Sequence, residues 1–277
     1  MTQQIINVGH SPDPDDAFMF FALAHGQVRI RDYRIEHVLE DIQSLNERAQ
    51  RGELEVTAVS AHACAHLAGR YHVLGAGSSV GRGYGPTVVA PVPRGLNSLL
   101  GKRIAVPGLL TTAYLVLRLR LPEFEPVVMP FDRIPQAVLD HEVPAGLLIH
   151  EGQLTYEDLG LHLVESLGTW WERDTGLPLP LGLDVVRADL GPELCAEIGA
   201  ALRESVRYAR AHEDEALDYA LQFGRGIERE VAREFVRMYV NDDTEDMGEP
   251  GREALRVLWR RGAALGLFPD VGPVTFV

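Results

Sequence analysis

Short apolar runs alternate with segments of helical spacing along the first two thirds of the chain. The apolar runs are bounded by turn-forming residues, as strands are, and occupy residues 5–9, 33–39, 54–59, 86–90, 103–106, 126–130 and 145–149. The helical segments lie between them, at residues 17–25, 41–49, 61–68, 115–121 and 133–139. This alternation predicts an α/β fold with mostly parallel sheets flanked by helices. After Asp184 the pattern is helical, in residues 191–212, 213–224, 228–240 and 250–265.

One histidine follows a strand that is apolar throughout. Residues 145–149 show no polar alternation, which is typical of a parallel strand covered on both faces, and His150 comes next. Ligands of open parallel sheets bind at the carboxyl ends of strands, so this position favours chemistry. A histidine that caps the strand or binds a nearby carbonyl fits the local pattern equally well. Glu151 follows directly and is the expected charged neighbour of the imidazole.

The first strand ends in an acidic, proline-rich turn, residues 10–16, with the sequence HSPDPDD. A predicted helix follows, with Asp15 or Asp16 as its N-cap, and its first N–H groups point towards whatever lies over the sheet. A rigid turn and a cap explain Asp13 and Asp15. Ser11 and Asp16 are candidates for contact with a ligand.

Hydroxyl side chains stand at two further junctions between strand and helix. Ser60 follows residues 54–59, where a role as N-cap and a role in binding are compatible. Thr111 and Thr112 follow a glycine turn after residues 103–106. Because this second junction offers backbone donors, two hydroxyls and a helix dipole to a carboxylate, it favours binding over a cap alone.

Proline and glycine divide the chain at two places. Pro91-Val92-Pro93 cannot join the interior of a sheet, and residues 168–182 are again rich in both residue types. We therefore predict one lobe of residues 1–89 plus 183–277 and a smaller lobe of residues 90–182 that carries His150, with the ligand cleft between them. Trp170 and Trp171, in the second crossing, either close over an apolar ligand or pack the hinge.

Metal-binding residue types are sparse. His62 and His66 are four residues apart on a predicted helix, but no third ligand follows at a recognisable spacing, so packing or surface histidines are preferred. Cys64 and Cys195 are the only cysteines and lie far apart in the sequence, which indicates neither a disulfide framework nor a thiolate metal site. We predict no metal and no cofactor.

A glycine-rich segment begins at Gly75. Residues 81–85, GRGYG, lack the GK[ST] ending of a phosphate-binding loop and precede a strand instead of a helix, so they are not a nucleotide signature. Arg82, inside this segment, is a candidate contact for an anion.

Length and charge restrict the partners. The chain has 277 residues, which suits two domains of about 100–150 residues. Its net charge of −14 argues against nucleic acid or an anionic membrane as a partner, so local groups must hold any anionic ligand. Residues 1–16 lack a basic and apolar leader, and no apolar run approaches the ~20 residues of a membrane span. We expect a cytoplasmic protein with a small-molecule partner; the sequence carries no signal for its oligomeric state.

Several segments in order resemble one enzyme family, the 1,4-dihydroxy-6-naphthoate synthases of the futalosine pathway to menaquinone. They are residues 11–20 (SPDPDDAFMF), 106–114 (VPGLLTTAY), 148–151 (LIHE), 170–182 (WWERDTGLPLPLG) and 239–241 (YVN). The likeness spans nearly the whole chain. It implies the two-lobed fold of type II periplasmic binding proteins.

The resemblance also implies a reaction and a site. The family converts cyclic dehypoxanthine futalosine to 1,4-dihydroxy-6-naphthoate without a redox cofactor or metal, and its proton-accepting histidine matches His150. Its substrate-contact segments correspond to Ala58, Val59 and Ser60, and to Thr111, Thr112 and Ala113.

Two positions depart from the family pattern. Ala58 stands where the family has a lysine, and Asp15 stands where asparagine is usual. A lysine there could pair with the substrate carboxylate, and removing the partner of a buried charge costs several kcal/mol. Either another group such as Arg82 replaces the lysine, or the ligand differs.

Three functions follow as hypotheses. In the first, a lyase of menaquinone (vitamin K2) biosynthesis, His150 removes a proton from the substrate and drives carbon–carbon cleavage that leaves an aromatic naphthoate. The second is chorismate dehydratase, the sister activity of the same superfamily. The third is a non-catalytic solute-binding protein for a small carboxylate.

Overall fold

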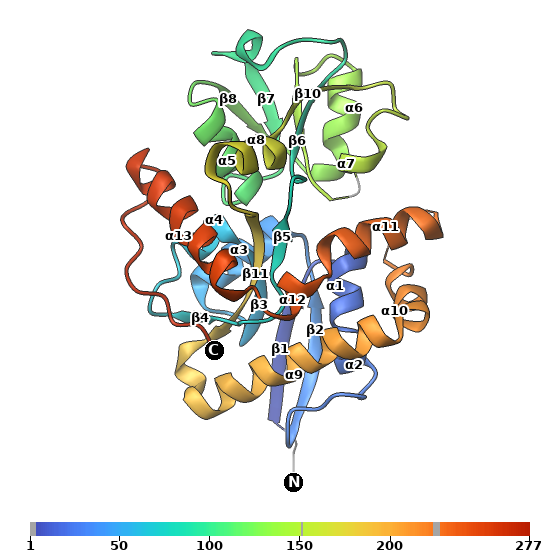
Figure 1. Ribbon diagram of the computed structural model, residues 1–277, viewed down its shortest axis with the longest axis vertical. Coiled ribbons are helices and arrows are strands. Elements are labelled where there is room, and N and C mark those ends of the chain that lie inside the picture. The colour runs from blue at the N-terminus through green and yellow to red at the C-terminus, as the bar shows by residue number, and fades with distance from the viewer. Residues whose placement is uncertain (1–3, 151, 224–227) are drawn as a thin grey trace.

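The computed structural model describes residues 4–150, 152–223 and 228–277. It has two lobes, each built on one sheet (Figure 1). The first sheet contains β1 (Gln4–His10), β2 (Tyr33–Leu39), β3 (Val56–Ser60), β4 (Tyr71–Val73), β5 (Ser79–Gly81) and β11 (Leu179–Arg187). The second contains β6 (Thr87–Ala90), β7 (Arg103–Val106), β8 (Glu125–Val128), β9 (Gly146–Leu148) and β10 (His162–Ser166).

Helices cover both sheets. The first lobe carries α1 (Pro14–Met19), α2 (Phe21–Ala24), α3 (Ile42–Arg51), α4 (Ala61–Cys64), α9 (Pro192–Ala211), α10 (Glu213–Ala220), α11 (Arg229–Tyr239), α12 (Asp242–Glu245) and α13 (Gly248–Ala264). The second carries α5 (Thr112–Arg120), α6 (Ile134–Leu139), α7 (Gly152–Thr155) and α8 (Leu167–Thr175). Short 3₁₀ turns occupy Leu96–Leu99, Phe131–Arg133 and Ala188–Leu190. No helix in the described ranges is both long and apolar enough to cross a membrane.

The sheets are mixed, so the prediction of mostly parallel sheets is wrong in this detail. The strands joined by helical crossovers are parallel: β1 pairs with β2 and β3, and β7 pairs with β8 and β9. In contrast, β11 runs antiparallel to β3, β4 and β5, and β6 runs antiparallel to β9 and β10. The physical reason is that β6 and β11 follow the crossings between the lobes. A strand that enters a sheet from the other lobe has no helical crossover from a neighbouring strand of that sheet, so it is not restricted to parallel pairing.

The chain crosses between the lobes a few residues earlier than predicted in both places. Because β5 pairs with β11 in the first sheet and β6 lies in the second, the first crossing is residues 82–86 and not residue 90. The return lies between the end of α8 and the start of β11, at residues 176–178 and not at 182. Pro91 and Pro93 follow β6 directly, so these prolines end a strand of the second lobe instead of separating the lobes.

Apolar packing joins the lobes at the hinge. One continuous core contains side chains of β3, β6, β7, α5, α8, β11 and α13. Trp171 of α8 is fully buried in it and donates from Nε1 to the carbonyl of Pro178, 3.0 Å away. Trp170 is partly buried against the same core. The paired tryptophans therefore pack the hinge, which was one of the two interpretations open from the sequence.

Candidate active site

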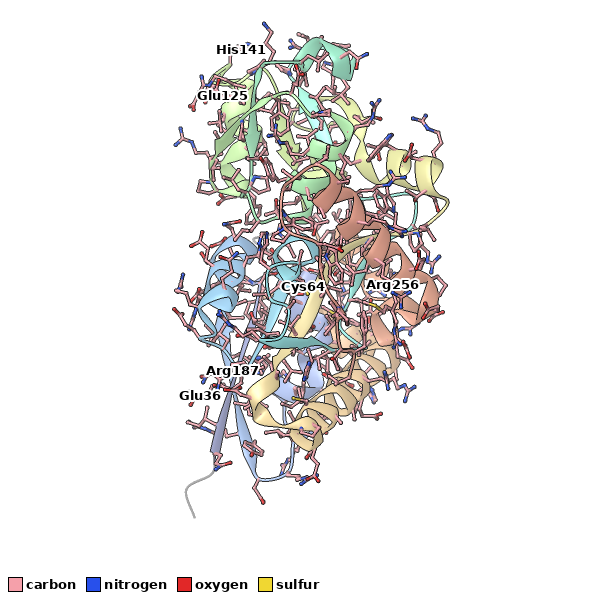
Figure 2. All side chains as sticks on the ribbon, turned by 90° about the vertical axis from the view of Figure 1, so that its left-hand side faces the viewer. Glu36, Cys64, Glu125, His141, Arg187 and Arg256 are labelled. Carbon is pink, nitrogen blue, oxygen red and sulfur yellow. The ribbon has the colours of Figure 1, made fainter. Side chains whose placement is uncertain are left out.

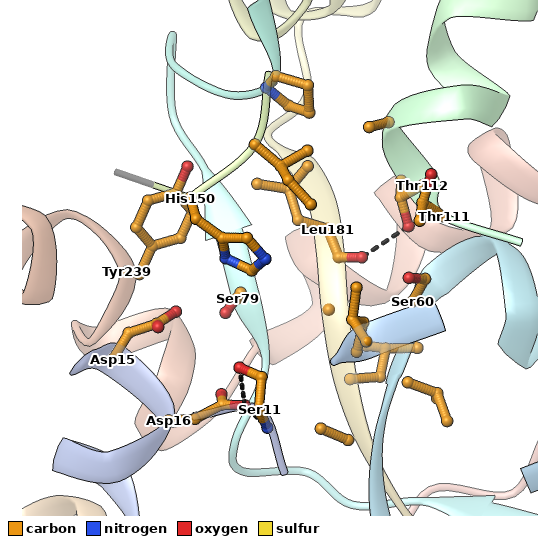
Figure 3. A pocket seen from close by; sticks show the side chains of 18 of the residues that line it. Ser11, Asp15, Asp16, Ser60, Ser79, Thr111, Thr112, His150, Leu181 and Tyr239 are labelled. Atoms are coloured by element: carbon orange, nitrogen blue, oxygen red, sulfur yellow. Dashed lines mark hydrogen bonds between the residues drawn. The ribbon is translucent and has the colours of Figure 1, made fainter. Parts of the chain in front are cut away.

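A cavity of about 720 Å³, a volume that includes its open mouth, lies between the lobes (Figure 3). All nine residues predicted for the site line it: Ser11, Asp16, Ala58, Val59, Ser60, Thr111, Thr112, Ala113 and His150. They come from the ends of β1, β3, β7 and β9 and from the helices or turns that follow. The topology thus brings together strand ends that lie up to 140 residues apart in the sequence, as expected for α/β sheets.

His150 projects into the cavity from the second lobe (Figure 3). Its φ is 54°, in the left-handed region that non-glycine residues adopt only at a cost of order 1–3 kcal/mol and often at functional sites. Its Nδ1 atom lies 3.2 Å from Oδ2 of Asp13, a nearly buried carboxyl group of the first lobe. The ring of Phe131 packs edge-on against the imidazole, 4.8 Å between centroids. Glu151, the neighbour expected from the sequence, lies outside the described residues.

The prediction of the cap of α1 is wrong. The N-cap residue is Asp13, and neither Asp15 nor Asp16 occupies that position. The Asp13 side chain makes no capping hydrogen bond and instead faces His150 of the other lobe. Its role could not be recognised from the sequence, because a proline-rich turn explains an aspartate there equally well.

Asp16 is held by Ser11. Its Oδ2 accepts hydrogen bonds from the backbone N–H of Ser11 at 2.7 Å and from the Ser11 hydroxyl at 2.8 Å. Burial raises the pKa of Asp16 to about 6, although the two bonds from Ser11 oppose the shift. This pair forms the floor of the cavity on the side of the first lobe.

Asp15 lines the same side of the cavity and is 7% exposed. Its Oδ1 is buried and accepts no hydrogen bond from the described residues. Burial, followed by the charges of Asp16 and Asp13, raises the pKa of Asp15 well above its usual value. Asp15 therefore lines the cavity directly, although a turn and a cap alone explain an aspartate at this position in the sequence.

The opposite side of the cavity is formed by the junction of β7 and α5 and by the end of β3. The Thr111 hydroxyl donates to the carbonyl of Gly108 at 2.8 Å and accepts from the N–H of Tyr114 at 3.2 Å, so it caps α5. The Thr112 hydroxyl donates to the carbonyl of Leu181 at 2.6 Å. It also accepts from the N–H of His62 at 3.2 Å. Both hydroxyls are thus engaged within the protein.

The remaining donors of this side are backbone groups and one serine. The N–H groups of Thr112 and Ala113 belong to the first turn of α5, where a helix provides no acceptor for them. Asn46 donates to the Ser60 hydroxyl oxygen at 3.1 Å, which leaves the hydroxyl hydrogen of Ser60 for a ligand. Asn46 also accepts from the N–H of Ser60 at 2.8 Å. No local pattern around Asn46 indicates this support from α3.

Arg82 does not belong to the cavity, so its prediction as an anion contact is wrong. Its guanidinium forms a two-pronged ion pair with Asp243, with both N–O distances 2.7 Å. No lysine or arginine of the described chain lines the cavity. Arg82 therefore does not take the place of the lysine that the resemblance implies at position 58.

His62 of α4 and His66, two residues beyond the end of that helix, serve packing. His62 is buried, and its Nδ1 lies 3.3 Å from the carbonyl oxygen of Thr111. Phe268 packs against both His62 and His66. The packing interpretation of these residues fits this arrangement.

Two residues on the cavity join the lobes. The Tyr239 hydroxyl of α11 donates to the side-chain carbonyl oxygen of Gln153, on α7, at 3.0 Å. Both side chains line the cavity. Of these two, only Tyr239 appeared in a segment noted in the sequence, and its contact with the second lobe is visible only in the fold.

The arrangement suits proton transfer on a small molecule. An imidazole oriented by a carboxyl group lies between buried acids and a set of neutral hydrogen-bond donors. Such a site can hold an anionic group on one side and remove a proton near the other. The fold and the site together define a two-lobed, binding-protein-like protein whose small-molecule site lies between its lobes.

Comparisons with known proteins identify the family. A family profile described as menaquinone biosynthesis matches residues 6–264. The chain is 45% identical to a 1,4-dihydroxy-6-naphthoate synthase of Thermus thermophilus, over 95% of this chain and 96% of that protein. It is 38% identical to a synthase of the same name from Streptomyces coelicolor, over 99% and 98% of the two chains. The chain belongs to this menaquinone-biosynthesis family, and the resemblance found in the sequence is confirmed.

Solved structures confirm the fold. A crystal structure of an Archaeoglobus fulgidus protein matches with a TM-score of 0.92 and 53% identity, over 97% of this chain and 100% of that one. A Candida albicans protein described as having the generic periplasmic binding protein fold matches with a TM-score of 0.73 at 16% identity, over 97% and 92%. The second likeness concerns the fold alone, and it agrees with the predicted two-lobed architecture.

Proposed function

We propose that this chain catalyses the reaction of the 1,4-dihydroxy-6-naphthoate synthases, the conversion of cyclic dehypoxanthine futalosine to 1,4-dihydroxy-6-naphthoate. The relatives that carry this name match nearly the full length of both chains. The reaction is a carbon–carbon cleavage in menaquinone biosynthesis. Its driving force includes formation of an aromatic ring.

The observation that carries the proposal is the pairing of His150 with Asp13 at the cavity. We place the imidazole hydrogen on Nδ1, 3.2 Å from the carboxylate oxygen of Asp13 that can accept it, so that Nε2 keeps the lone pair that a base needs. When Nε2 takes a proton from the substrate, the carboxylate of Asp13 stabilises the imidazolium that forms. His150 is the proton acceptor, and Asp13 is its positioning residue.

The substrate carboxylate is held on the opposite side of the cavity. The N–H groups of Thr112 and Ala113 lie at the positive end of α5, a helix of nine residues, and the Ser60 hydroxyl lies beside them (Figure 3). A carboxylate bound there needs no lysine at position 58. Ala58 and Val59 then provide apolar contact for the ring system.

The proposal also covers the compartment in which the enzyme acts and the kind of partner it binds. A net charge of −14 and a cavity between two lobes fit a small-molecule enzyme of the cytoplasm, without nucleic acid as a partner.

Turnover with the purified protein tests the proposal. Incubation with cyclic dehypoxanthine futalosine should yield 1,4-dihydroxy-6-naphthoate, identified by mass spectrometry, and incubation with chorismate should leave chorismate unchanged. Loss of water from chorismate without naphthoate formation would establish the dehydratase instead. Binding of the naphthoate in calorimetry without any turnover would establish a solute-binding protein.

A further inference from the structure

Asp15 is a carboxyl group on the cavity that the protein itself leaves partly unsatisfied. It lies in the first turn of α1, is 7% exposed, and has a buried Oδ1 that accepts nothing from the described residues. Figure 3 shows its carboxyl group opposite Ser60 and Thr112, with the His150 ring between the two sides. Because native proteins rarely leave buried polar atoms without a partner, the missing partner of Oδ1 points to a bound molecule.

The neighbouring donors are already used by other acceptors. Ser11 donates both its N–H and its hydroxyl to Asp16. His150 Nδ1 lies against Asp13, and the Tyr239 hydroxyl donates to Gln153. Only the backbone N–H groups of Asp15 and Asp16 favour an ionised Asp15, and they are outweighed by burial and by the adjacent acids. An ionised carboxylate at this position is therefore poorly stabilised.

No cation on the packed elements changes this balance. Tyr84 and Tyr239 face Asp15, and burial raises the pKa of both phenols, that of Tyr84 to about 12. The arginines of α9 and α11, two helices packed against α1, instead pair with acidic side chains. They are Arg203 with Asp246, Arg207 with Glu245, Arg210 with Asp242 and Glu245, Arg229 with Asp214 and Asp218, Arg233 with Glu213 and Asp214, and Arg237 with Glu213. Burial and the neighbouring acids therefore favour the neutral form of Asp15, a carboxylic acid with one O–H to donate.

The proposed reaction requires such a donor. The product is a dihydroxynaphthoate, so a ring carbonyl oxygen of the substrate becomes a phenolic oxygen. His150 takes the proton of a hydroxyl group next to the scissile carbon–carbon bond, so that when this bond breaks the fragment carrying the hydroxyl leaves as a carbonyl compound and the electron pair passes into the ring as an enolate. Negative charge then develops on that oxygen, while the carboxylate is held at α5 across the cavity. A preorganised donor at the charged oxygen accelerates such a step. The proton held by His150 is then returned to the enolate oxygen, which becomes the phenol.

We propose that Asp15 is a catalytic residue of this site, which in its neutral form donates a hydrogen bond to the ring oxygen that gains negative charge as the carbon–carbon bond breaks. This inference rests on the proposed function. Asp15 gives up no proton in the cleavage; it stabilises the enolate. The three aspartates of one turn then have separate tasks: Asp13 orients the base, Asp16 fixes the floor of the cavity, and Asp15 binds the developing charge.

Steady-state kinetics of three variants tests the role. Asp15→Asn keeps a neutral donor of the same shape and should retain kcat within about tenfold. Asp15→Ala has no donor and should lose kcat by on the order of 10²–10³-fold with little change in KM, because the hydrogen bond strengthens only as charge develops. Asp270→Asn, the same substitution at an exposed position, is the matched control and should behave as wild type. If Asp15→Ala does not fold, Asp15→Ser, whose hydroxyl is too short to reach the same oxygen, replaces it.

The pH profile provides a readout that a structural role would not alter. The wild-type kcat should fall at high pH as Asp15 ionises, and Asp15→Asn should lack this limb. An infrared difference spectrum of wild type minus Asp15→Asn should also contain the carbonyl band of a protonated carboxyl group. This measurement needs no substrate.

The outcomes separate this inference from the proposed function. Absence of turnover in the wild type overturns the proposed function, whatever the infrared spectrum shows. Normal wild-type turnover overturns the role of Asp15 alone in any of three cases: Asp15→Ala keeps kcat, Asp15→Asn is as slow as Asp15→Ala, or the carbonyl band is absent.

Discussion

Two turns of similar design face each other across the cavity. The first, residues 11–16, comprises the connection from β1 and the first residues of α1, and the second, residues 107–111, joins β7 to α5. Each turn follows a strand, begins a helix and carries polar side chains. In the second turn the Thr111 hydroxyl caps α5, and Thr112, at the start of that helix, bonds the carbonyl of Leu181. In the first, Asp15 keeps an oxygen without a partner in the described chain.

The difference shows that the same local pattern can present either backbone or side chain to a ligand. Where the side chains satisfy the protein, the exposed groups are the first N–H groups of a nine-residue helix. Where a carboxyl group is surrounded by other acids and by burial, the side chain itself becomes the donor. The side at α5 can therefore bind an anion, and the side at Asp15 can stabilise a negative charge that develops during the reaction. His150 lies between the two sides.

The largest expected effect is on His150. If the two sides hold the ligand and the imidazole performs the chemistry, His150→Ala and His150→Asn should bind substrate but lose turnover by about a hundredfold or more. Calorimetry and kcat separate these effects. His141→Ala is a matched control, since His141 is an exposed histidine of the same lobe with φ of 57° that lies away from the cavity (Figure 2). Wild-type turnover in either His150 variant would exclude its role as the base.

Asp184, a buried aspartate whose pKa is affected by Asp16 of the cavity, should destabilise the fold as pH rises. Asp184 of β11 is fully buried, neither of its oxygens has a partner among the described residues, and burial raises its pKa well above 3.8, helped by Asp16. A raised folded-state pKa gives stability that is fully present below about pH 4 and is lost as pH rises towards that pKa. Asp184→Asn should therefore gain stability relative to the wild type as pH rises above about 4, and the gain should stop growing once Asp184 ionises in the folded wild type.

Urea unfolding of both proteins between pH 4 and pH 8 measures this difference. Burial lowers the pKa of His10 to about 3 and that of His62 to about 4, so both histidines destabilise the fold as pH falls below 6.5. Their contribution is the same in both proteins and cancels in the comparison. A difference between wild type and variant that does not change with pH would contradict a neutral, buried Asp184.

Substitution of Thr112 tests whether its hydroxyl stabilises the fold or binds the ligand. Thr112→Val leaves the carbonyl of Leu181 and the N–H of His62 without their partner, which should cost about 1–3 kcal/mol of unfolding free energy. Thr112→Ser keeps the hydroxyl and should lose much less. If Thr112→Val instead weakened naphthoate binding without loss of stability, the hydroxyl would be a ligand donor and the contrast between the two sides would disappear.

The smallest effect is expected for Arg82. Its guanidinium is about half exposed and paired with Asp243, away from the cavity. Arg82→Ala should cost about 0.2–1 kcal/mol of stability and leave KM unchanged. A large rise in KM would indicate instead that Arg82 contacts the substrate in place of a lysine at position 58.

The sequence by itself determined which chain segments meet at the cavity. The apolar runs that precede Ser11, Ser60, Thr111 and His150 are strands because such runs pack on both faces, and ligands collect at their carboxyl ends. The strand of residues 33–39 and that of residues 103–106 were predicted with the bounds that the structure gives them. Local propensity and burial suffice for these conclusions, because both depend on neighbouring residues.

Only the tertiary structure decided what each polar atom binds. Asp13 contacts His150 across 137 positions of sequence, and Arg82 pairs with Asp243 across 161 positions, so neither partner can be found from local pattern. The same holds for the crossings between the lobes, because the sheet that a strand joins depends on distant strands such as β11. A buried polar group must be satisfied by whatever folding places beside it, and that neighbour is set by the topology of the whole chain.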